Sequence, residues 1–499
     1  MTSTTASSAA STASSITGSI TGSTAAPASD HRWAALGVIA LAQLMVALDA
    51  TIVNVALPTA QRALGFDDAH RAYVVTAYTL SFAGLLLLGG KTSDRIGRRR
   101  SLTIGLTGFA LASALAGAAP TFEVLVAGRA LQGASAAFMA PAALALIAST
   151  FTEPRERGQA FGVFGAVASS GAVVGLLLGG VLTEYAGWRW CLYVNVIVAG
   201  VVIAVGRRVL PSDDGFPVPV DVISGVLATG GLAGLVLGAS EAAARGWDSA
   251  QVLVPGLVGL GLVAGFLVRQ HGLVAPLLPL SVLRDRGRAT AYAATAISVV
   301  GTFGMFLMLT YHFQVVLGWS PVRTGLAFVP MTLAVAASSY GLASRLMHRV
   351  APRALVAPGL LVAAAGLALL TQLTPSSGYA TVILPAEVLV GLGIGCVFTP
   401  SIGVATSGVD PRQAGIAAAT ANTAMQIGSS VGTAVLNTVA VDATRDFVGS
   451  PTAALVHGFA TATGGAAVAL VVGAMLVVAF LRPATPAHPA HGQTSGGAS

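Results

Sequence analysis

The stretch LLGGKTSDRIGRRR, residues 87–100, passes from an apolar run into a block of charge. Its Gly-Gly-Lys-Thr is similar to the end of a phosphate-binding loop, which needs G-x-x-x-x-G-K-[ST] between a strand and a helix. The first glycine of that pattern should stand where this chain has Leu85. Residues 74–90 carry no charge, and so they are too long and too apolar for a strand of a soluble sheet. The stretch therefore indicates a membrane-spanning helix that ends in a short charged loop.

The composition also favours a membrane protein. The chain has 499 residues, of which 55% are hydrophobic and 9% are charged, and its mean hydropathy is +0.80. Soluble domains carry roughly 25% charged residues. A chain with so little charge cannot cover a water-facing surface, so we expect the lipid bilayer to be its solvent. The two cysteines, Cys191 and Cys396, lie in apolar segments and predict neither a disulfide framework nor a metal site.

Long apolar segments recur along the whole chain. A helix that crosses a bilayer needs about 20 predominantly apolar residues. By this criterion the sequence predicts an all-α membrane protein with fourteen spans, which places both termini on one side. The predicted spans are 34–57, 73–90, 101–119, 124–149, 159–184, 188–206, 222–240, 252–269, 290–317, 323–346, 353–373, 380–402, 413–439 and 456–481.

The loops indicate the orientation. Most of the 26 Lys and Arg residues fall in loops on the side of the termini, whereas the acidic residues are spread evenly over both sides. This asymmetry follows the positive-inside rule and predicts cytoplasmic termini. The excess of basic residues, which gives a net charge of +7, is then explained by membrane orientation and by interaction with anionic lipid headgroups. No nucleic-acid partner is expected. Residues 1–32 and 483–499 are predicted to be disordered tails, and the first lacks the features of a secretory signal.

Two pairs of segments suggest an internal repeat. PRERGQA at 154–160 and PRQAGIA at 411–417 share the pattern P-R-x-x-G-x-A, and each opens a predicted span. More weakly, Gly90 and Arg95 after the second span are echoed in residues 341–349 after the tenth. Because transporters are often built from duplicated halves, we expect six spans, two inserted spans and six more. The predicted parts are an N-terminal half at 33–208, the inserted spans with a linker at 209–288, and a C-terminal half at 289–482.

Several motifs together resemble one known family. They are LDATIVNVALP at 48–58, GKTSDRIGRRR at 90–100, RALQGASAA at 129–137, and YVVTAYTL at 73–80, with Tyr73 where tryptophan is usual. Over about residues 30–482 the chain resembles the fourteen-span drug–proton antiporters of the major facilitator superfamily, the branch of multidrug and antibiotic exporters. The resemblance implies the major facilitator fold and transport by alternating access.

Glycines in the fifth span match the antiporter motif in spacing: Gly162, Gly171, Gly175, Gly179 and Gly180. That motif usually has proline where this chain has Leu176, which weakens the expectation of a kinked helix. A face of small residues lets helices approach closely. It either couples the two halves or only packs tightly.

One acid and one base lie deep in the predicted spans. An ionised Asp49 inside the first span costs at least ~2.5–3.5 kcal/mol unless it is paired or hydrated. Arg129 in the fourth span does not deprotonate, so it needs a carboxylate, carbonyls or water, and Asp49 is the natural candidate. The resemblance implies that Asp49 takes part in proton coupling and that Arg129 helps to release the proton. The alternatives are a structural hydrogen bond for Asp49, and a side chain that reaches the outer headgroups for Arg129.

Other polar, aromatic and Met side chains within the spans are candidates for the substrate cavity. Glu387, the only acid well inside the second half, attracts a cationic substrate, binds a second proton, or reaches the outer water. The amides, Asn437 included, either bind substrate or join helices, and the aromatic and Met side chains either line a cavity or pack. The predicted cavity residues are Tyr78, Gln132, Gln314, Glu387, Asn422, Met425 and Gln426.

The loop 90–100 is predicted to control conformational change. The resemblance implies that it latches the cytoplasmic side in the outward-facing state, while the alternative is a purely topological role for its basic residues. Asp94 is expected to cap the third span or to pair with Arg95 or Arg98. The predicted gating residues are Gly90, Asp94, Arg95, Gly97 and Arg98, together with the five glycines of the fifth span.

These observations predict a proton-driven exporter of hydrophobic or amphipathic small molecules, antibiotics or other drugs, in a bacterial inner membrane. We expect a monomer that uses the proton gradient and no cofactor. The alternative is a proton-coupled symporter for a small metabolite. An enzyme is not expected, because the chain has no H-E-x-x-H, no clustered acidic pair and no G-x-S-x-G.

Overall fold

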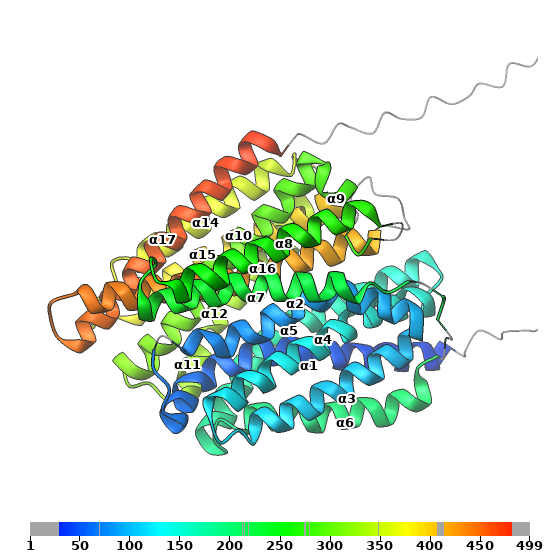
Figure 1. The fold of residues 1–499 in the computed structure, drawn as a ribbon, viewed down its shortest axis with the longest axis horizontal. Helices are drawn as coiled ribbons and strands as arrows, with labels where there is room; N and C mark the ends of the chain where they lie inside the picture. The colour runs from blue at the N-terminus through cyan, green and yellow to red at the C-terminus, as the bar shows by residue number, and fades with distance from the viewer. Residues whose placement is uncertain are drawn as a thin grey trace, which may run out of the picture.

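The chain forms long helices that gather into two bundles, with a further helical pair between them (Figure 1). The computed structural model describes residues 29–481, apart from 69, 212, 214, 218, 274–275, 279, 348 and 407–413. Of the predicted tails, residues 1–28 and 483–499 lie outside the described residues, as do residues 411–413 of the second repeat motif. Residues 29–32, which we expected to be part of the disordered tail, instead form the start of the first helix. Within the described part of the chain every regular element is a helix, as the composition predicts.

The first eight long helices are α1 (Ser29–Leu64), α2 (Arg71–Ile96), α3 (Arg98–Gly117), α4 (Phe122–Thr150), α5 (Pro154–Tyr185), α6 (Trp190–Val209), α7 (Val222–Arg245) and α8 (Ala250–Gly272). A short α9 (Leu280–Arg284) leads to α10 (Arg286–Tyr311), and π-helical turns interrupt several of the later helices. The remaining elements are η1 (His312–Val316), α11 (Pro321–Ala327), α12 (Val329–Ala336), η2 (Ala337–Ala343), α13 (Ser344–Leu346), α14 (Arg353–Leu370), η3 (Tyr379–Ile383), α15 (Leu384–Thr406), α16 (Ala414–Asp446) and α17 (Pro451–Phe480).

Thirteen helical stretches of the described residues are long and apolar enough to cross a membrane. The remaining predicted span, 101–119, corresponds to α3, a helix of 20 residues that begins with three arginines. Those arginines, with the Thr, Ser and Gly residues that follow, lower its hydropathy, but α3 packs along α4 and α6 like the other helices. The fold is therefore that of a multi-pass helical membrane protein with the predicted fourteen spans.

Packing divides these helices into two groups. In the first, α1 packs on α5 and α6, and α4 packs on α2 and α3. In the second, α17 packs on α10, α14 and α16, α10 also packs on α16, and α15 packs on α14 and α12. We call these groups the N-bundle (α1–α6) and the C-bundle (α10–α17). The face of the molecule where α1 begins and α17 ends is called the termini face, and the other the far face.

The inserted helices α7 and α8 form a hairpin that touches both bundles. α7 packs on α2 of the N-bundle and on α16 of the C-bundle, while α8 packs mainly on α7 (Figure 1). Tyr73 Oη donates to Glu241 Oε1 at 3.1 Å, and Thr438 Oγ1 donates to the carbonyl oxygen of Ala239 at 2.7 Å. The hairpin thus covers one seam between the bundles.

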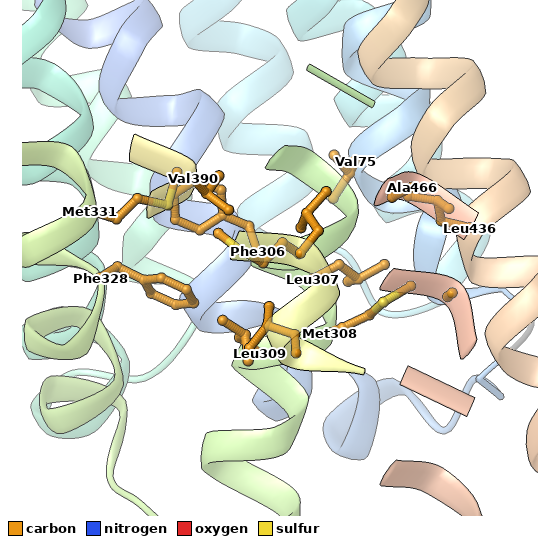
Figure 2. Close-up of a cluster of buried hydrophobic side chains, with 14 of the residues drawn as sticks. Val75, Phe306, Leu307, Met308, Leu309, Phe328, Met331, Val390, Leu436 and Ala466 are labelled. Atoms are coloured by element: carbon orange, nitrogen blue, oxygen red, sulfur yellow. The ribbon is translucent and has the colours of Figure 1, made fainter. Parts of the chain in front are cut away.

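The largest apolar core joins the bundles near the far face. It contains Ile52 and Val75 from the N-bundle together with Leu307, Leu436 and other residues of the C-bundle. Figure 2 shows part of this core, where side chains of α2, α10, α12, α15, α16 and α17 meet. A second core lies within the N-bundle nearer the termini face. The N-bundle residues of this core come from the far-face parts of their helices, although its C-bundle residues extend further, so the bundles are closed against each other at the far face.

Candidate functional site

Asp49 of α1 lies at the centre of the N-bundle with no exposed surface. Its Oδ2 accepts from Arg129 Nη1 of α4 at 2.6 Å. Its Oδ1 accepts from Gln132 Nε2 at 3.0 Å and from Asn195 Nδ2 of α6 at 2.7 Å. A buried carboxylate is tolerated when its charge is paired and its lone pairs are occupied, and this one meets both conditions.

Arg129 is equally enclosed, at 1% exposure. Besides Asp49, it donates from Nε to the carbonyl oxygen of Val74 at 3.1 Å and from Nη1 to Gln132 Oε1 at 2.8 Å. Its guanidinium lies over the ring of Tyr78, 4.6 Å from the ring centre. Since the side chain is held inside the bundle by α1, α2 and α4, it does not extend to the outer headgroups.

Gln132 links this ion pair to a third element. Its Nε2 also donates to Ser113 Oγ of α3 at 2.7 Å, so that α1, α3, α4 and α6 meet at one polar cluster. We call Asp49, Arg129, Gln132, Asn195 and Ser113 the carboxylate cluster. Asn195 and Ser113 were not among the residues predicted from the sequence. The signal for Asn195 was present, because it is the single amide in the predicted span 188–206.

The carboxylate cluster has the composition of a proton-exchange site. Its one titratable acid is buried beside a cation that cannot release a proton. A proton added to Asp49 removes the charge that holds Arg129 and turns one oxygen from an acceptor into a donor. Protonation therefore changes which side chains of α1, α4 and α6 bond to one another.

The predicted cavity residues fall into separate environments. Tyr78 and Gln132 belong to the surroundings of Asp49, and both are buried. Gln314 donates from Nε2 to the carbonyl oxygen of Val55 at 2.8 Å, which links η1 of the C-bundle to α1. On α16, Gln426 is buried, whereas Asn422 and Met425 are half-buried. A shared substrate-binding role for these residues stays a prediction.

Glu387 lies on α15 inside the C-bundle and has no exposed surface. Tyr379 Oη donates to the carbonyl oxygen of Ala327 at 2.7 Å and is 3.4 Å from Glu387 Oε2. Within the part of the chain that the structure describes, Glu387 Oε1 has no hydrogen-bond partner. Because Glu387 is fully buried, its carboxyl group does not reach the outer water. Its contacts are also separate from the carboxylate cluster.

The predicted gating loop is held by a residue that the sequence did not indicate. Asp213, in the linker after α6, accepts at Oδ1 from the backbone amide of Arg98 at 2.8 Å and from that of Arg99 at 3.4 Å. It therefore supplies the carboxylate at the start of α3 that we expected of Asp94. Gly97 has φ 94°, and a Cβ there would lie 2.4 Å from the carbonyl oxygen of Asp213, which explains the glycine.

Two further contacts fasten the linker and the end of α6 to this loop. The backbone amide of Phe216 donates to the carbonyl oxygen of Asp94 at 2.8 Å. Arg99 donates from Nη2 to the carbonyl oxygen of Arg207 at 2.5 Å. Arg95 lies in the last turn of α2. A Cβ at Gly90 would make only ordinary contact with Pro141, 3.7 Å away.

The glycines of α5 do not share one neighbour. A Cβ at Gly171, Gly175 or Gly179 would meet α1 of the same bundle, at 2.6, 2.1 and 2.9 Å from the nearest atom. A Cβ at Gly180 would lie 2.7 Å from the carbonyl oxygen of Pro321 in the C-bundle, whereas Gly162 faces open space. Most of this face thus packs within the N-bundle, and Gly180 makes the close approach between the bundles.

Known proteins share the sequence and the fold. The family model described as Major Facilitator Superfamily matches residues 39–433. The chain is 48% identical over 461 residues to the puromycin resistance protein pur8 of Streptomyces alboniger, covering 90% of each chain. It is 38% identical over 457 residues to the cephamycin export protein CmcT of Amycolatopsis lactamdurans, covering 91% of this chain and 92% of that one.

A solved structure agrees in fold. The crystal structure of the peptide transporter POT in complex with sulfate matches with a TM-score of 0.65 over 89% of this chain and 94% of that chain, at 15% identity. This likeness concerns the fold alone. The resemblance found in the sequence motifs is thus confirmed, and the chain belongs to the Major Facilitator Superfamily of membrane transport proteins.

Proposed function

We propose that this protein is a proton-driven exporter of drug-like small molecules, with Asp49 as its proton-binding group. The observation that carries the proposal is the buried carboxylate of Asp49, which accepts from Arg129, Gln132 and Asn195 at 2.6, 3.0 and 2.7 Å. The named activities of the relatives, puromycin resistance and cephamycin export, support an antibiotic as the substrate.

Proton binding changes the balance between two states of the transporter. A ligand shifts a conformational equilibrium only by its different affinity for the two states. With the bundles closed at the far face, three donors occupy the carboxylate of Asp49 and compete with a proton. A proton therefore favours the state in which Arg129 has withdrawn, and proton entry drives alternating access.

The chain acts as a transport protein rather than as an enzyme, and as a monomer, since each chain contains both bundles. The termini face is cytoplasmic in the bacterial inner membrane, as the distribution of Lys and Arg predicts. In that orientation the far face is outer, and the closed far face corresponds to a state that loads substrate from the cytoplasm. One substrate molecule leaves as one or more protons enter.

The test uses everted membrane vesicles with an imposed proton gradient. Puromycin, a cephamycin and a panel of lipophilic cations are added, and collapse of the gradient is followed by a fluorescent pH indicator. We expect collapse with the wild type and none with Asp49→Asn. Glu123→Gln, which removes an exposed carboxylate at the start of α4, is the control and should behave like the wild type.

Two outcomes would contradict the proposal. Full gradient collapse with Asp49→Asn in correctly inserted protein would remove Asp49 from proton coupling. Uptake of a compound by intact cells, without gradient collapse by any compound in the vesicles, would favour the symporter.

A further inference from the structure

Arg71 occupies an unusual position for a cation. It is the first residue of α2, at the far face, where the partial positive charge of the helix N-terminus disfavours a basic side chain. The side chain is nevertheless 1% exposed. Neither the helix N-terminus nor the membrane surface favours a buried guanidinium here. The side chain must therefore be stabilised by the residues that surround it.

The guanidinium is enclosed by the opposite bundle. Arg71 Nε donates to Asn437 Oδ1 of α16 at 2.7 Å. Its centre lies 4.5 Å from the ring centre of Tyr311 at the end of α10, and 5.4 Å from that of Phe459 on α17. All three partners belong to the C-bundle, whereas Arg71 belongs to the N-bundle. We call Asn437, Tyr311 and Phe459 the arginine socket.

Two more hydrogen bonds tie the same seam. Asn437 Nδ2 donates to the carbonyl oxygen of Asp68 at 3.3 Å, and Tyr311 Oη donates to Gln61 Oε1. Gln61 in turn donates from Nε2 to Asp68 Oδ1 at 2.8 Å. Arg71, Gln61 and Asp68 of the N-bundle side are therefore joined to the C-bundle at one point, and any opening of the far face must break this point.

Arg71 also has a second partner on its own side. Its Nη1 makes no hydrogen bond within the described residues, but it lies 3.8 Å from Asp68 Oδ1, three residues earlier in the chain. A cavity of about 430 Å³ adjoins the two side chains, with Thr444 and Arg445 of α16 on its other wall. The guanidinium thus has both a charged partner within the N-bundle and space into which it can move.

We propose that Arg71 is the gating residue of the far face. When it is seated in the arginine socket, it holds the outer end of the transport path closed. When the bundles separate, it leaves Asn437, Tyr311 and Phe459 and pairs with Asp68, which compensates its charge in the open state. This inference rests on the proposed alternating-access exporter and adds the group that controls release to the outside.

The experiment measures the gate directly, without drug or proton gradient. Spin labels are attached at Tyr185, which ends α5, and at Val448, between α16 and α17, in a full-length variant without Cys191 and Cys396. Both sites are at the far face, and their side chains are 78% and 97% exposed. Pulsed dipolar spectroscopy in lipid nanodiscs then gives the populations of short and long distances.

Arg71→Lys and Asn437→Ala should each raise the ratio of long to short distances about tenfold, the shift expected from losing a hydrogen bond to a charged group. Lysine keeps the charge but lacks the planar group that both stacks and bonds in the socket. Asp68→Asn should lower the ratio, because it removes the partner of the open state and keeps an acceptor for Gln61.

Arg323→Lys is the matched control. Arg323 also lies at the far face and stacks on an aromatic ring, 3.9 Å from the ring centre of Trp319, but both belong to the C-bundle. It should leave the distances unchanged. An unchanged distribution in both Arg71→Lys and Asn437→Ala would overturn the proposal, as would an equal shift in Arg323→Lys. Should Arg71→Lys fail to fold, Asn437→Ala alone decides.

The gate and the proton site can fail independently. The distances of the Arg71 and Asn437 variants are compared with those of the wild type at one fixed pH, so a difference between them reports on the gate, whereas the loss of gradient collapse in Asp49→Asn reports on the proton site. If Arg71→Lys and Asn437→Ala open the far face but no compound collapses the proton gradient, the gating role of Arg71 is supported and proton antiport is contradicted.

Discussion

Asn195 on α6 donates to the same oxygen of Asp49 that accepts from Gln132, at 2.7 Å and 3.0 Å. The carboxylate is therefore held from two sides on one oxygen, while Arg129 holds the other. A single proton on Asp49 is in a position to alter the contacts of three helices at once. Asn195 thus directly contacts the carboxylate that we propose as the proton-binding group.

Asn195→Ala should lower the free energy of unfolding by about 1.5–3 kcal/mol, because a hydrogen bond to a buried charge is lost. It should also slow drug-dependent gradient collapse, since the carboxylate is less well held. Thermal unfolding in detergent and the vesicle assay check the two effects. Asn54→Ala is the control, because Asn54 is also buried but, among the described residues, its amide donates only to the carbonyl oxygen of Ala50 in its own helix, at 3.2 Å. Equal behaviour of the two variants would contradict the role given to Asn195.

Asp213→Ala should destabilise the start of α3 by about 0.5–2 kcal/mol, the usual cost of a lost helix cap. The reason is that Asp213 accepts from the amides of Arg98 and Arg99. Hydrogen exchange of the peptide that contains these amides gives the measurement, and it should become faster.

Asp94→Asn is the matched variant on the loop itself. It should leave the exchange of the same peptide unchanged, because Asp94 contacts the linker through its carbonyl oxygen. If the loop acts as a latch, this variant slows turnover more than it weakens substrate binding. Faster exchange in Asp94→Asn than in Asp213→Ala would return the capping role to Asp94.

The fold could be predicted because each helix that crosses the bilayer needs about 20 apolar residues, and such runs are visible in the sequence between charged loops. The ends of the helices could not, since hydropathy marks the hydrocarbon and not the helix. The first span was predicted at 34–57, yet α1 continues to Leu64. The π-helical turns η1, η2 and η3 were also not predicted, because hydropathy does not distinguish a π-helical turn from an α-helical one.

The pairing of Asp49 with Arg129 could be predicted from the free-energy cost of an unpaired charge in a membrane. Asp49 and Arg129 each needed a partner, and the structure joins them at 2.6 Å. Residues whose partners are far away in the sequence could not be recognised from the sequence pattern. Asp213 is an ordinary acid in a linker, and Arg71 precedes the predicted span at 73–90 and reads as a loop base. Only the folded chain shows that Asp213 contacts the start of α3 and that Arg71 contacts the C-bundle.

The ion pair that closes the α7–α8 hairpin should not respond to pH in the working range. Arg269 donates to both oxygens of Asp221, at 2.9 and 3.1 Å, and these hydrogen bonds lower the pKa of Asp221 to about 2. A depressed pKa means that the stabilisation is complete above the ordinary value of about 4 and is lost as the pH falls through the folded value.

The distance between spin labels placed on α7 and α8 should therefore be constant between about pH 5 and 8, while transport varies with pH. Asp221→Asn should broaden this distance equally across the range. A distance that follows the pH dependence of transport would show that the hairpin takes part in proton coupling.

Gly180→Ala should weaken the closed far face. The added Cβ would lie 2.7 Å from the carbonyl oxygen of Pro321 and 2.8 Å from Cα of Val322, which are backbone atoms of the opposite bundle. Such overpacking costs about 1–3 kcal/mol, and the bundles relieve it by moving apart. The spin-label distance between Tyr185 and Val448 should lengthen, and export should slow.

Gly162→Ala separates this effect from a general one of alanine in α5. Nothing lies within 4 Å of a Cβ at Gly162, so the change adds helix propensity of up to about 1 kcal/mol and no clash. This variant should keep the short distance and unfold at the same or a higher temperature. If Gly162→Ala opened the far face as much as Gly180→Ala, the contact between α5 and Pro321 would not be what keeps the bundles together.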